Sequence, residues 1–252
     1  MLNYLTFGDP GPAPAVLIAH GLFGSARNWS VICKRLSDRG RVVAVDMRNH
    51  GNSLRHDTHD YPALAQDLAE VIDALGGPVD VIGHSMGGKA AMQLALDHPE
   101  KLRRLVVGDI APVTYTHSQQ PYIDAMRRVD LTHLTRRSEA ATQLGTFGVE
   151  PALQSFFTQS LDLTEKRWRL NLDALEQCMP DIMSFPETQQ SWGGAALFLS
   201  GALSDYVRPE HRDTIKRLFP GARFAKIPGA GHWLHADKPR EFEAALRVFL
   251  EN

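Results

Sequence analysis

Cysteine is scarce in this chain, which has only Cys33 and Cys178 among 252 residues. Two thiols cannot form a disulfide framework, so a small disulfide-stapled fold is excluded and a reducing compartment is expected. An excess of either charge is also missing, because 27 Lys and Arg residues face 29 Asp and Glu residues and the net charge is −2. Such a surface does not attract nucleic acid or anionic lipid over a distance, so we expect neither as a partner.

Long hydrophobic runs are absent as well. The apolar stretch at 14–23 is too short to cross a bilayer and contains His20 and Gly21. No Lys or Arg precedes Arg27, so the basic region that begins a secretory signal is missing. We therefore expect a cytoplasmic protein with one full α/β domain and an insertion.

The patterns that are present alternate between strand and helix. Helices are expected near 64–75, near 89–96 and after Pro239, where apolar residues recur every three or four positions or good helix formers cluster. Short apolar runs predict strands at 3–7, 15–19, 41–45, 79–82, 105–107, 195–199 and 223–227. The alternation is typical of an α/β fold with a doubly wound, mostly parallel sheet, here of seven strands.

The segment at 111–191 interrupts this alternation, since its composition is mainly helical and no convincing core strand appears in it. We interpret it as a helical cap inserted into a core made of 1–110 and 192–252. The alternative is a set of extra helices packed passively on the sheet.

A Gly-x-Ser-x-Gly pattern at Gly83, Ser85 and Gly87 follows an apolar strand and precedes a helix. A serine on such a sharp turn adopts a strained backbone conformation, and side chains larger than glycine on either side would collide. The turn lifts the hydroxyl out of the sheet and the next helix directs its first amides toward it. The pattern predicts that Ser85 is a nucleophile, whereas the alternative is a serine that only caps the helix.

The turn at 20–24, His-Gly-Leu-Phe-Gly, follows the strand at 15–19. It can direct the backbone N–H of Leu22 at the space above Ser85, and the N–H of Met86 is the natural second donor. Two amides facing a developing oxyanion would supply the electrostatic part of acyl transfer. A plain tight turn is the alternative.

His232 lies in a glycine-rich loop between the last strand and the last helix. A hydroxyl is a weak nucleophile until a base removes its proton, and histidine is the usual base near neutral pH. His232 also lies at the carboxyl end of a strand, where sites form in open α/β sheets. We therefore predict that His232 is the general base.

Other histidines compete with it. We expect packing roles for His20 and His84, which are held in tight turns, and a helix-capping role for His235. His56 and His59 resemble metal ligands only superficially, and a solvated polar loop is the better interpretation because no further ligands accompany them. No metal site is expected.

A carboxylate must orient the imidazole, and two candidates remain. Asp109 follows the strand at 105–107. Asp205 follows the strand after the cap but is displaced by one position, and Ser204 occupies the place where the acid is usual. We favour Asp109, with Ser204 in support.

The segments at 20–25, 46–53, 83–89, 109–113 and 229–233 together resemble the YbfF-type bacterial esterases, a group of the alpha/beta-hydrolase superfamily with a eukaryotic mitochondrial branch. The resemblance implies the alpha/beta-hydrolase fold and cofactor-free hydrolysis of acyl esters, with acyl thioesters as a second option. It also implies Asp109 as the acid, because this group tends to lack the carboxylate after the cap. The sequence departs from the group in placing Asp205 beside Ser204.

These features predict a serine hydrolase that works through an acyl-enzyme on a small-molecule acyl substrate. We expect a mostly apolar acyl pocket, for which the candidate lining residues are Phe23, Met86, Phe156, Trp168 and Trp233. Haloalkane dehalogenases and epoxide hydrolases are excluded because they need Asp at position 85. The alternatives that remain are a cofactor-free perhydrolase and a catalytically silent binding protein on the same scaffold.

Overall fold

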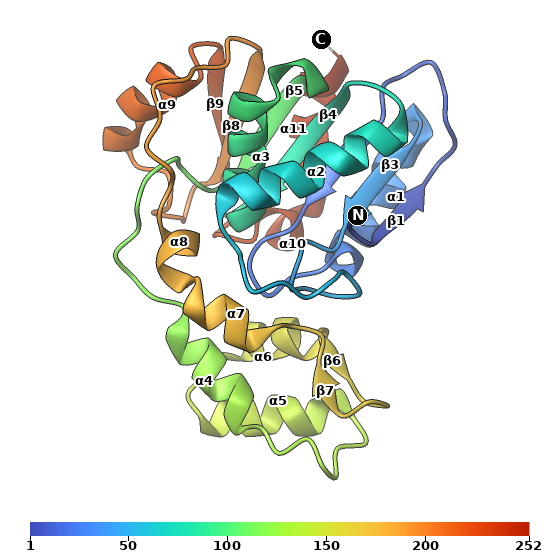
Figure 1. Ribbon diagram of the computed structural model, residues 1–252, viewed down its shortest axis with the longest axis vertical. Helices are drawn as coiled ribbons and strands as arrows, with labels where there is room; N and C mark the ends of the chain where they lie inside the picture. The colour runs from blue at the N-terminus through green and yellow to red at the C-terminus, as the bar shows by residue number, and fades with distance from the viewer. Residues whose placement is uncertain (252) are drawn as a thin grey trace.

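A seven-stranded sheet forms the centre of the computed structural model, which describes residues 1–251 (Figure 1). The strand order is β1-β3-β2-β4-β5-β8-β9; β1 runs antiparallel to β3 and all other neighbours are parallel. This confirms the expected doubly wound, mostly parallel sheet. The strands are β1 (Tyr4–Phe7), β2 (Val16–Ala19), β3 (Val42–Val45), β4 (Val79–His84), β5 (Leu102–Gly108), β8 (Ala195–Gly201) and β9 (Ala222–Ile227).

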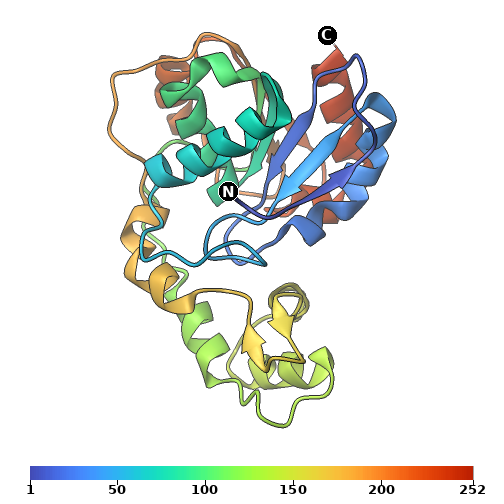
Figure 2. The same cartoon turned by 45° about the vertical axis from the view of Figure 1, so that its right-hand side comes forward.

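Helices cover both faces of the sheet (Figure 2). Along β2, the side chains of Val16 and Ile18 pack in one buried cluster and those of Leu17 and Ala19 in another. Burial on both faces explains why the strands read as continuous apolar runs. The first cluster includes α1 (Ser30–Leu36), α10 (Leu234–Asp237) and α11 (Pro239–Glu251), and the second includes α2 (Tyr61–Leu75), α3 (Met86–Asp97) and α9 (Arg212–Leu218).

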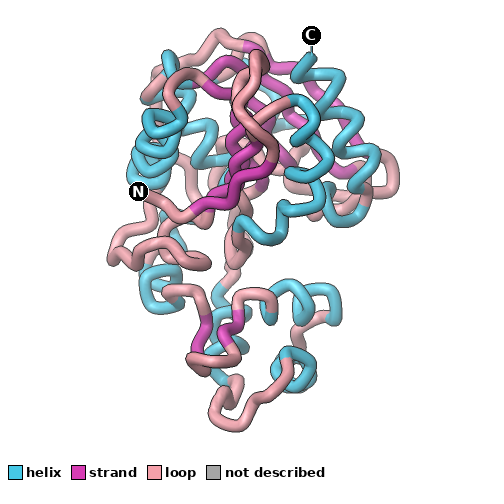
Figure 3. The backbone as a smooth tube through the Cα atoms, turned by 90° about the vertical axis from the view of Figure 1, so that its right-hand side faces the viewer, coloured by secondary structure: helices cyan, strands magenta, loops and turns pink. Residues whose placement is uncertain are grey.

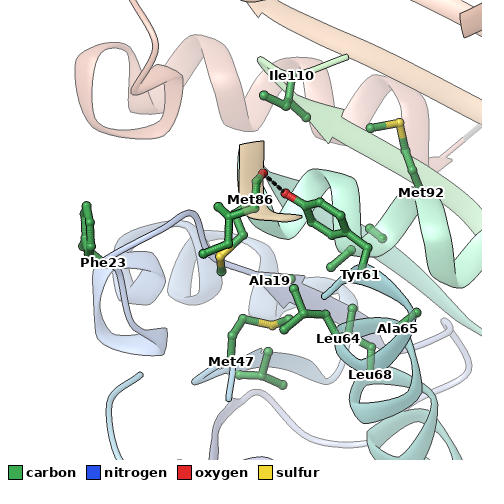
Figure 4. Packing of buried hydrophobic residues seen from close by; sticks show 14 of the residues in the cluster. Ala19, Phe23, Met47, Tyr61, Leu64, Ala65, Leu68, Met86, Met92 and Ile110 are labelled. Carbon is green, nitrogen blue, oxygen red and sulfur yellow. Dashed lines mark hydrogen bonds between the residues drawn. The ribbon is translucent and has the colours of Figure 1, made fainter. Parts of the chain in front are cut away.

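Local signals define the start and the end of α2. Asp60 accepts a hydrogen bond from the Ala63 N–H at 2.9 Å, and Pro62 lies in the first turn. Gly76 ends the helix at φ 88°, in the left-handed region that glycine adopts without strain. The helix thereby places Tyr61 at its first position, where the Tyr61 hydroxyl donates to the Ile182 carbonyl at 2.6 Å (Figure 4).

The chain at 120–183 lies beyond one end of the sheet, and all three views show it below the strands (Figures 1, 2 and 3). The chain that follows runs back alongside the sheet to the start of β8 (Figure 1). A small hairpin joins the helices at 120–183 but does not pair with the main sheet. Its two-residue strands are too short to leave a periodic pattern in the sequence. The segment contains α4 (Gln120–Arg128), α5 (Arg137–Thr146), α6 (Pro151–Thr158), β6 (Leu161–Asp162), β7 (Arg167–Trp168), α7 (Leu172–Gln177) and α8 (Met179–Met183).

Short 3-10 turns complete the fold at Ala26–Trp29, Ser37–Arg39, Pro99–Lys101 and Pro209–His211. Cys33 and Cys178 are both buried and unpaired. Within residues 1–251, no helix combines the length and the apolar character that crossing a bilayer would require.

Candidate active site

Ser85 occupies the sharp turn between β4 and α3, with φ 53° and ψ −122°. This conformation is strained for a residue with a Cβ atom and persists only where the surroundings hold it. The Ser85 N–H donates to the Gly108 carbonyl at 2.9 Å, and the Ser85 carbonyl accepts from the Lys89 N–H at 3.0 Å. Because the hydroxyl makes no capping hydrogen bond to α3, the helix-capping alternative is wrong.

The flanking glycines are required by close contacts. A Cβ atom on Gly83 would lie 2.2 Å from the Gly87 carbonyl oxygen, and one on Gly87 would lie 2.4 Å from the Ala19 carbonyl oxygen. Both distances are far below van der Waals contact. The Gly-x-Ser-x-Gly spacing therefore allows α3 to pack tightly against β2 and β4.

His232 follows β9, and its Nδ1 atom lies 2.8 Å from Asp109 Oδ2. Asp109 follows β5 at φ 50° and is fully buried. Its Oδ1 atom accepts the Gly201 N–H at 3.0 Å, and its Oδ2 atom also accepts the Ser204 hydroxyl in a short hydrogen bond. The ionised carboxylate can only accept, so the His232 ring donates from Nδ1 and keeps Nε2 as an acceptor.

Asp205, the other candidate acid, points away from this cluster. Its side chain is 82% exposed and pairs with Arg208 at 3.5 Å. The structure therefore brings Asp109, and not Asp205, to His232.

Ser85 and His232 line the same cavity of about 230 Å³ between the sheet and the inserted segment. Phe23, Phe156 and Trp233 also line it, together with Leu22 and Met86. The Ser85 hydroxyl makes no hydrogen bond within residues 1–251, and in enzymes of this kind such bonds often tighten only when substrate is bound.

Trp168 does not line this cavity, so the expectation that it lines the acyl pocket is wrong. The ring is buried within the inserted segment, and its indole N–H donates to the Met126 carbonyl at 2.9 Å. A buried Trp needs such an acceptor, and the interior of the inserted segment supplies one.

Leu22 and Met86 line the same cavity as Ser85. Met86 is the first residue of α3, so its N–H has no acceptor inside the helix. Within the described chain, neither the Leu22 nor the Met86 amide has a hydrogen-bond partner. The tight turn is also present, because the Gly24 N–H donates to the Gly21 carbonyl at 3.0 Å.

Two contacts of His232 were not predicted by any motif in the sequence. His84 Nε2 donates to the His232 carbonyl at 2.8 Å, and the Tyr206 ring stacks on the His232 ring at 4.0 Å between centroids. Burial raises the pKa of Tyr206 to about 12, so this phenol stays neutral near pH 7. The stacked phenol restricts the orientation of the imidazole, and the His84 contact holds the His232 backbone.

His59 is buried, so the expectation of a solvated loop holds for the exposed His56 and is wrong for His59. Its Nε2 atom lies 3.2 Å from Met86 Sδ, and burial lowers its pKa to about 3. No group of three or more His, Cys, Asp or Glu side chains in residues 1–251 is placed to hold a metal ion.

The capping role expected for His235 is also wrong. The residue lies inside α10, and its ring stacks on Trp29 with centroids 4.1 Å apart and planes 15° apart. Burial lowers the pKa of His235 to about 3, so the imidazole packs as a neutral ring.

Lys89, one turn after Ser85 on α3, is a feature of the cavity that the sequence reasoning missed. Its Nζ atom donates to the carbonyls of Met183 at 3.0 Å and Ser184 at 2.6 Å and lies 4.8 Å from the centre of the Tyr115 ring. Its partners are carbonyl oxygens rather than carboxylates, and burial lowers its pKa to about 7. The available signal was a lysine at the start of a helical run whose other residues are mostly apolar.

Comparisons with known proteins agree with this geometry. The model of the alpha/beta hydrolase family matches residues 16–245. The chain is 41% identical to the sn-1-specific diacylglycerol lipase ABHD11 of Mus musculus, over 99% of this chain and 85% of that protein. It is 38% identical to the esterase YbfF of Escherichia coli, over 95% of this chain and 94% of that protein.

The solved structure of a marine microorganism esterase superposes with a TM-score of 0.93 and 37% identity, covering 98% of both chains. The resemblance to YbfF-type esterases is thereby confirmed. The chain belongs to the alpha/beta hydrolase family and is an enzyme of its esterase and lipase type.

Proposed function

We propose that the protein hydrolyses carboxylic esters through an acyl-enzyme on Ser85, with His232 as the general base and Asp109 as the orienting acid. One observation carries this proposal: His232 donates to a buried carboxylate at 2.8 Å while lining the same cavity as a serine on a strained turn. Nucleophile, base and orienting acid in this arrangement are what activation of a hydroxyl needs.

The reaction proceeds in two displacements. His232 Nε2 takes the Ser85 proton while Ser85 Oγ attacks the acyl carbonyl, and the amides of Leu22 and Met86 stabilise the resulting oxyanion. The alcohol then leaves with the proton from His232. A water molecule, deprotonated by the same imidazole, attacks the acyl-enzyme and releases the carboxylic acid.

The substrate that we propose is a small ester with an apolar acyl group. The cavity walls contributed by Phe23, Phe156 and Trp233 are aromatic, and such walls favour apolar chains. Acyl thioesters remain a second option, because the same acyl-enzyme would form from them. The relatives named as esterases and as a diacylglycerol lipase support ester hydrolysis.

We also propose a division of the chain into a core, at 1–110 and 192–252, and a cap, at 111–191. In support, the sheet strand β5 ends at Gly108 and β8 begins at Ala195, and every element between them lies outside the main sheet. Residues of this segment, Phe156 among them, form one side of the cavity.

The test is Ser85→Ala, assayed on a short p-nitrophenyl ester beside labelling with a fluorophosphonate probe. We expect kcat to fall by at least about 10³-fold and the label to depend on Ser85. Near-parental turnover by Ser85→Ala would contradict the proposal. A protein that takes no label and shows no turnover would be the silent scaffold. Bromination that requires peroxide and a carboxylic acid would identify a perhydrolase.

A further inference from the structure

Two buried histidines, His20 and His50, link the loop that follows β2 to the loop that follows β3. His20 Nε2 accepts the backbone N–H of Met47 at 3.0 Å, and His50 Nε2 accepts the backbone N–H of Phe23 at 3.1 Å. Each loop therefore supplies an imidazole acceptor to an amide of the other loop. We call this pair the histidine clasp.

The second nitrogen of each ring fixes its protonation. His20 Nδ1 lies 2.8 Å from the Gly21 carbonyl oxygen, and His50 Nδ1 lies 2.9 Å from the Arg48 carbonyl oxygen. A carbonyl only accepts, so both Nδ1 atoms carry a proton and both Nε2 atoms keep a lone pair. Only the neutral ring satisfies this arrangement, because a charged imidazole has no acceptor.

Burial keeps both rings in that neutral form. It lowers the pKa of His20, against the opposing effect of the Asp46 carboxylate, and it lowers the pKa of His50 well below its ordinary value. For His50, the neighbouring His20 and His59 rings lower the pKa further.

The turn at 20–24 contains a strained residue, so its conformation depends on stabilising contacts. Phe23 has φ 64°, a left-handed conformation that is strained for a residue other than glycine. Its N–H donates to His50, and the Gly24 N–H and the His20 Nδ1–H both donate to the Gly21 carbonyl on the other side of Leu22. The free amide of Leu22 lies between these two points, so its direction depends on both.

His50 also contacts the inserted segment. It forms an antiparallel β-bridge with Leu170, and the adjoining Asn49 carbonyl accepts the Asn171 N–H at 2.9 Å. The Phe23 ring packs edge-on against Phe157 of α6 at 5.4 Å between centroids. The clasp therefore lies where the Leu22 turn, the β3 loop and the inserted segment meet.

We propose that His20 and His50 are positioning residues, which hold the Leu22 amide in the orientation that binds the oxyanion. This inference rests on the proposed function, in which the Leu22 amide is an oxyanion donor. It adds two residues that act through backbone amides and touch no substrate.

The test compares His50→Leu, which removes the acceptor, with His50→Gln, whose side-chain oxygen can reach the position of Nε2. Turnover is measured per active site titrated with a fluorophosphonate, so that unfolded protein is not counted. We expect His50→Leu to lower kcat by about 10- to 100-fold, less than the full loss of an oxyanion donor, with KM changed by less than about threefold. His50→Gln should recover kcat to within about threefold of the parent.

A trifluoromethyl ketone, which forms an anionic adduct with the serine, gives an independent readout. Its affinity should fall in His50→Leu by the same factor as kcat, since both depend on the oxyanion donors. A merely structural role would lower Tm and the titrated fraction and leave kcat per site unchanged, and that result would overturn the inference. If Ser85→Ala is inactive in the same assay, the proposed function survives such a result.

The unsubstituted protein gives a test that does not depend on folding of a variant. Long-range ¹H–¹⁵N NMR should show His20 and His50 as neutral Nδ1–H tautomers, whereas His84, which donates from Nε2, should show the opposite tautomer. An Nε2–H tautomer at His50 would overturn the inference.

Discussion

At the residue scale, the buried Asp109 carboxylate has a partner for each of its oxygens. The Gly201 amide binds one oxygen, and His232 and Ser204 bind the other. A buried charge is tolerated only when it is satisfied in this way. The same contacts leave the carboxylate no freedom to turn away from the imidazole, which is what an orienting acid requires.

Asp109→Asn should therefore lower kcat by about 10²- to 10⁴-fold with little change in fold, because the amide N–H would favour the wrong imidazole tautomer. Hydrolysis of p-nitrophenyl butyrate measures the effect, with circular dichroism to verify folding. Asp205→Asn is the matched control and should stay within about twofold of the parent, since Asp205 is exposed and pairs with Arg208. Comparable losses in the two variants would contradict the assignment of the acid.

At the scale of elements, α2 and α3 both reach the carboxyl end of α8. Lys89 of α3 donates to the carbonyls of Met183 and Ser184, and Tyr61 of α2 donates to the carbonyl of Ile182. The last carbonyls of a helix have no partner inside it, so these side chains satisfy groups that would otherwise be buried unpaired. The hydrogen bonds of Lys89 and Tyr61 therefore fix the point at which the inserted segment returns to the sheet.

This contact predicts a pH dependence of stability. The pKa of Lys89 is about 7 in the folded chain against 10.5 as its ordinary value, so the unfolded chain binds more protons between these pH values. The free energy of unfolding should therefore rise with pH from pH 7 toward pH 10, by at most about 1.4 kcal/mol per pH unit, and this contribution should level off below pH 7.

Urea unfolding at pH 7, 8 and 9 measures it by comparison with Lys89→Met, which removes the titrating group. The difference in unfolding free energy, parent minus variant, should grow with pH over this range. Lys34→Met, at an exposed position of α1, is the control and should show a constant difference. A constant difference for Lys89→Met would show that Lys89 keeps an ordinary pKa.

At the scale of the whole molecule, the cavity exists only because the inserted segment is folded over the end of the sheet. Ser85 and His232 come from the sheet side, and Phe156 comes from α6. Phe156 packs against Trp233 at 6.3 Å between centroids, so the two sides meet through aromatic rings. The length of the acyl chain that fits is thus set by both parts together.

For the parent enzyme, kcat/KM should rise along a series of p-nitrophenyl esters by up to about fourfold per methylene until the cavity is filled, and then fall. Phe156→Ala should move the optimum to longer chains because it enlarges the cavity. Trp168→Phe should lower Tm without moving the optimum, since Trp168 lies outside the cavity and loses its hydrogen bond to Met126. A preference for short charged acyl groups, or an optimum moved by Trp168→Phe, would contradict this account.

The sequence by itself determined the sheet and the turn at Ser85. Strands buried on both faces must be apolar along their whole length, and a turn with φ 53° between packed elements requires glycine on both sides. Both requirements act over a few consecutive residues, so they leave a pattern that can be read. The position of His232 after the last strand, and after Ser85 in the chain, also predicted which histidine is the candidate base.

Only the tertiary structure decided which carboxylate reaches His232, that Trp168 is buried within the inserted segment, and that His59 is buried. The same is true of the contacts made by Lys89 and of the histidine clasp. Each of these depends on which distant loops the strand order brings together and on how side chains pack where they meet. Contacts between residues far apart in the chain leave no periodic pattern. For that reason no local motif predicted them, apart from the acid, where the sequence favoured Asp109 and left Asp205 open.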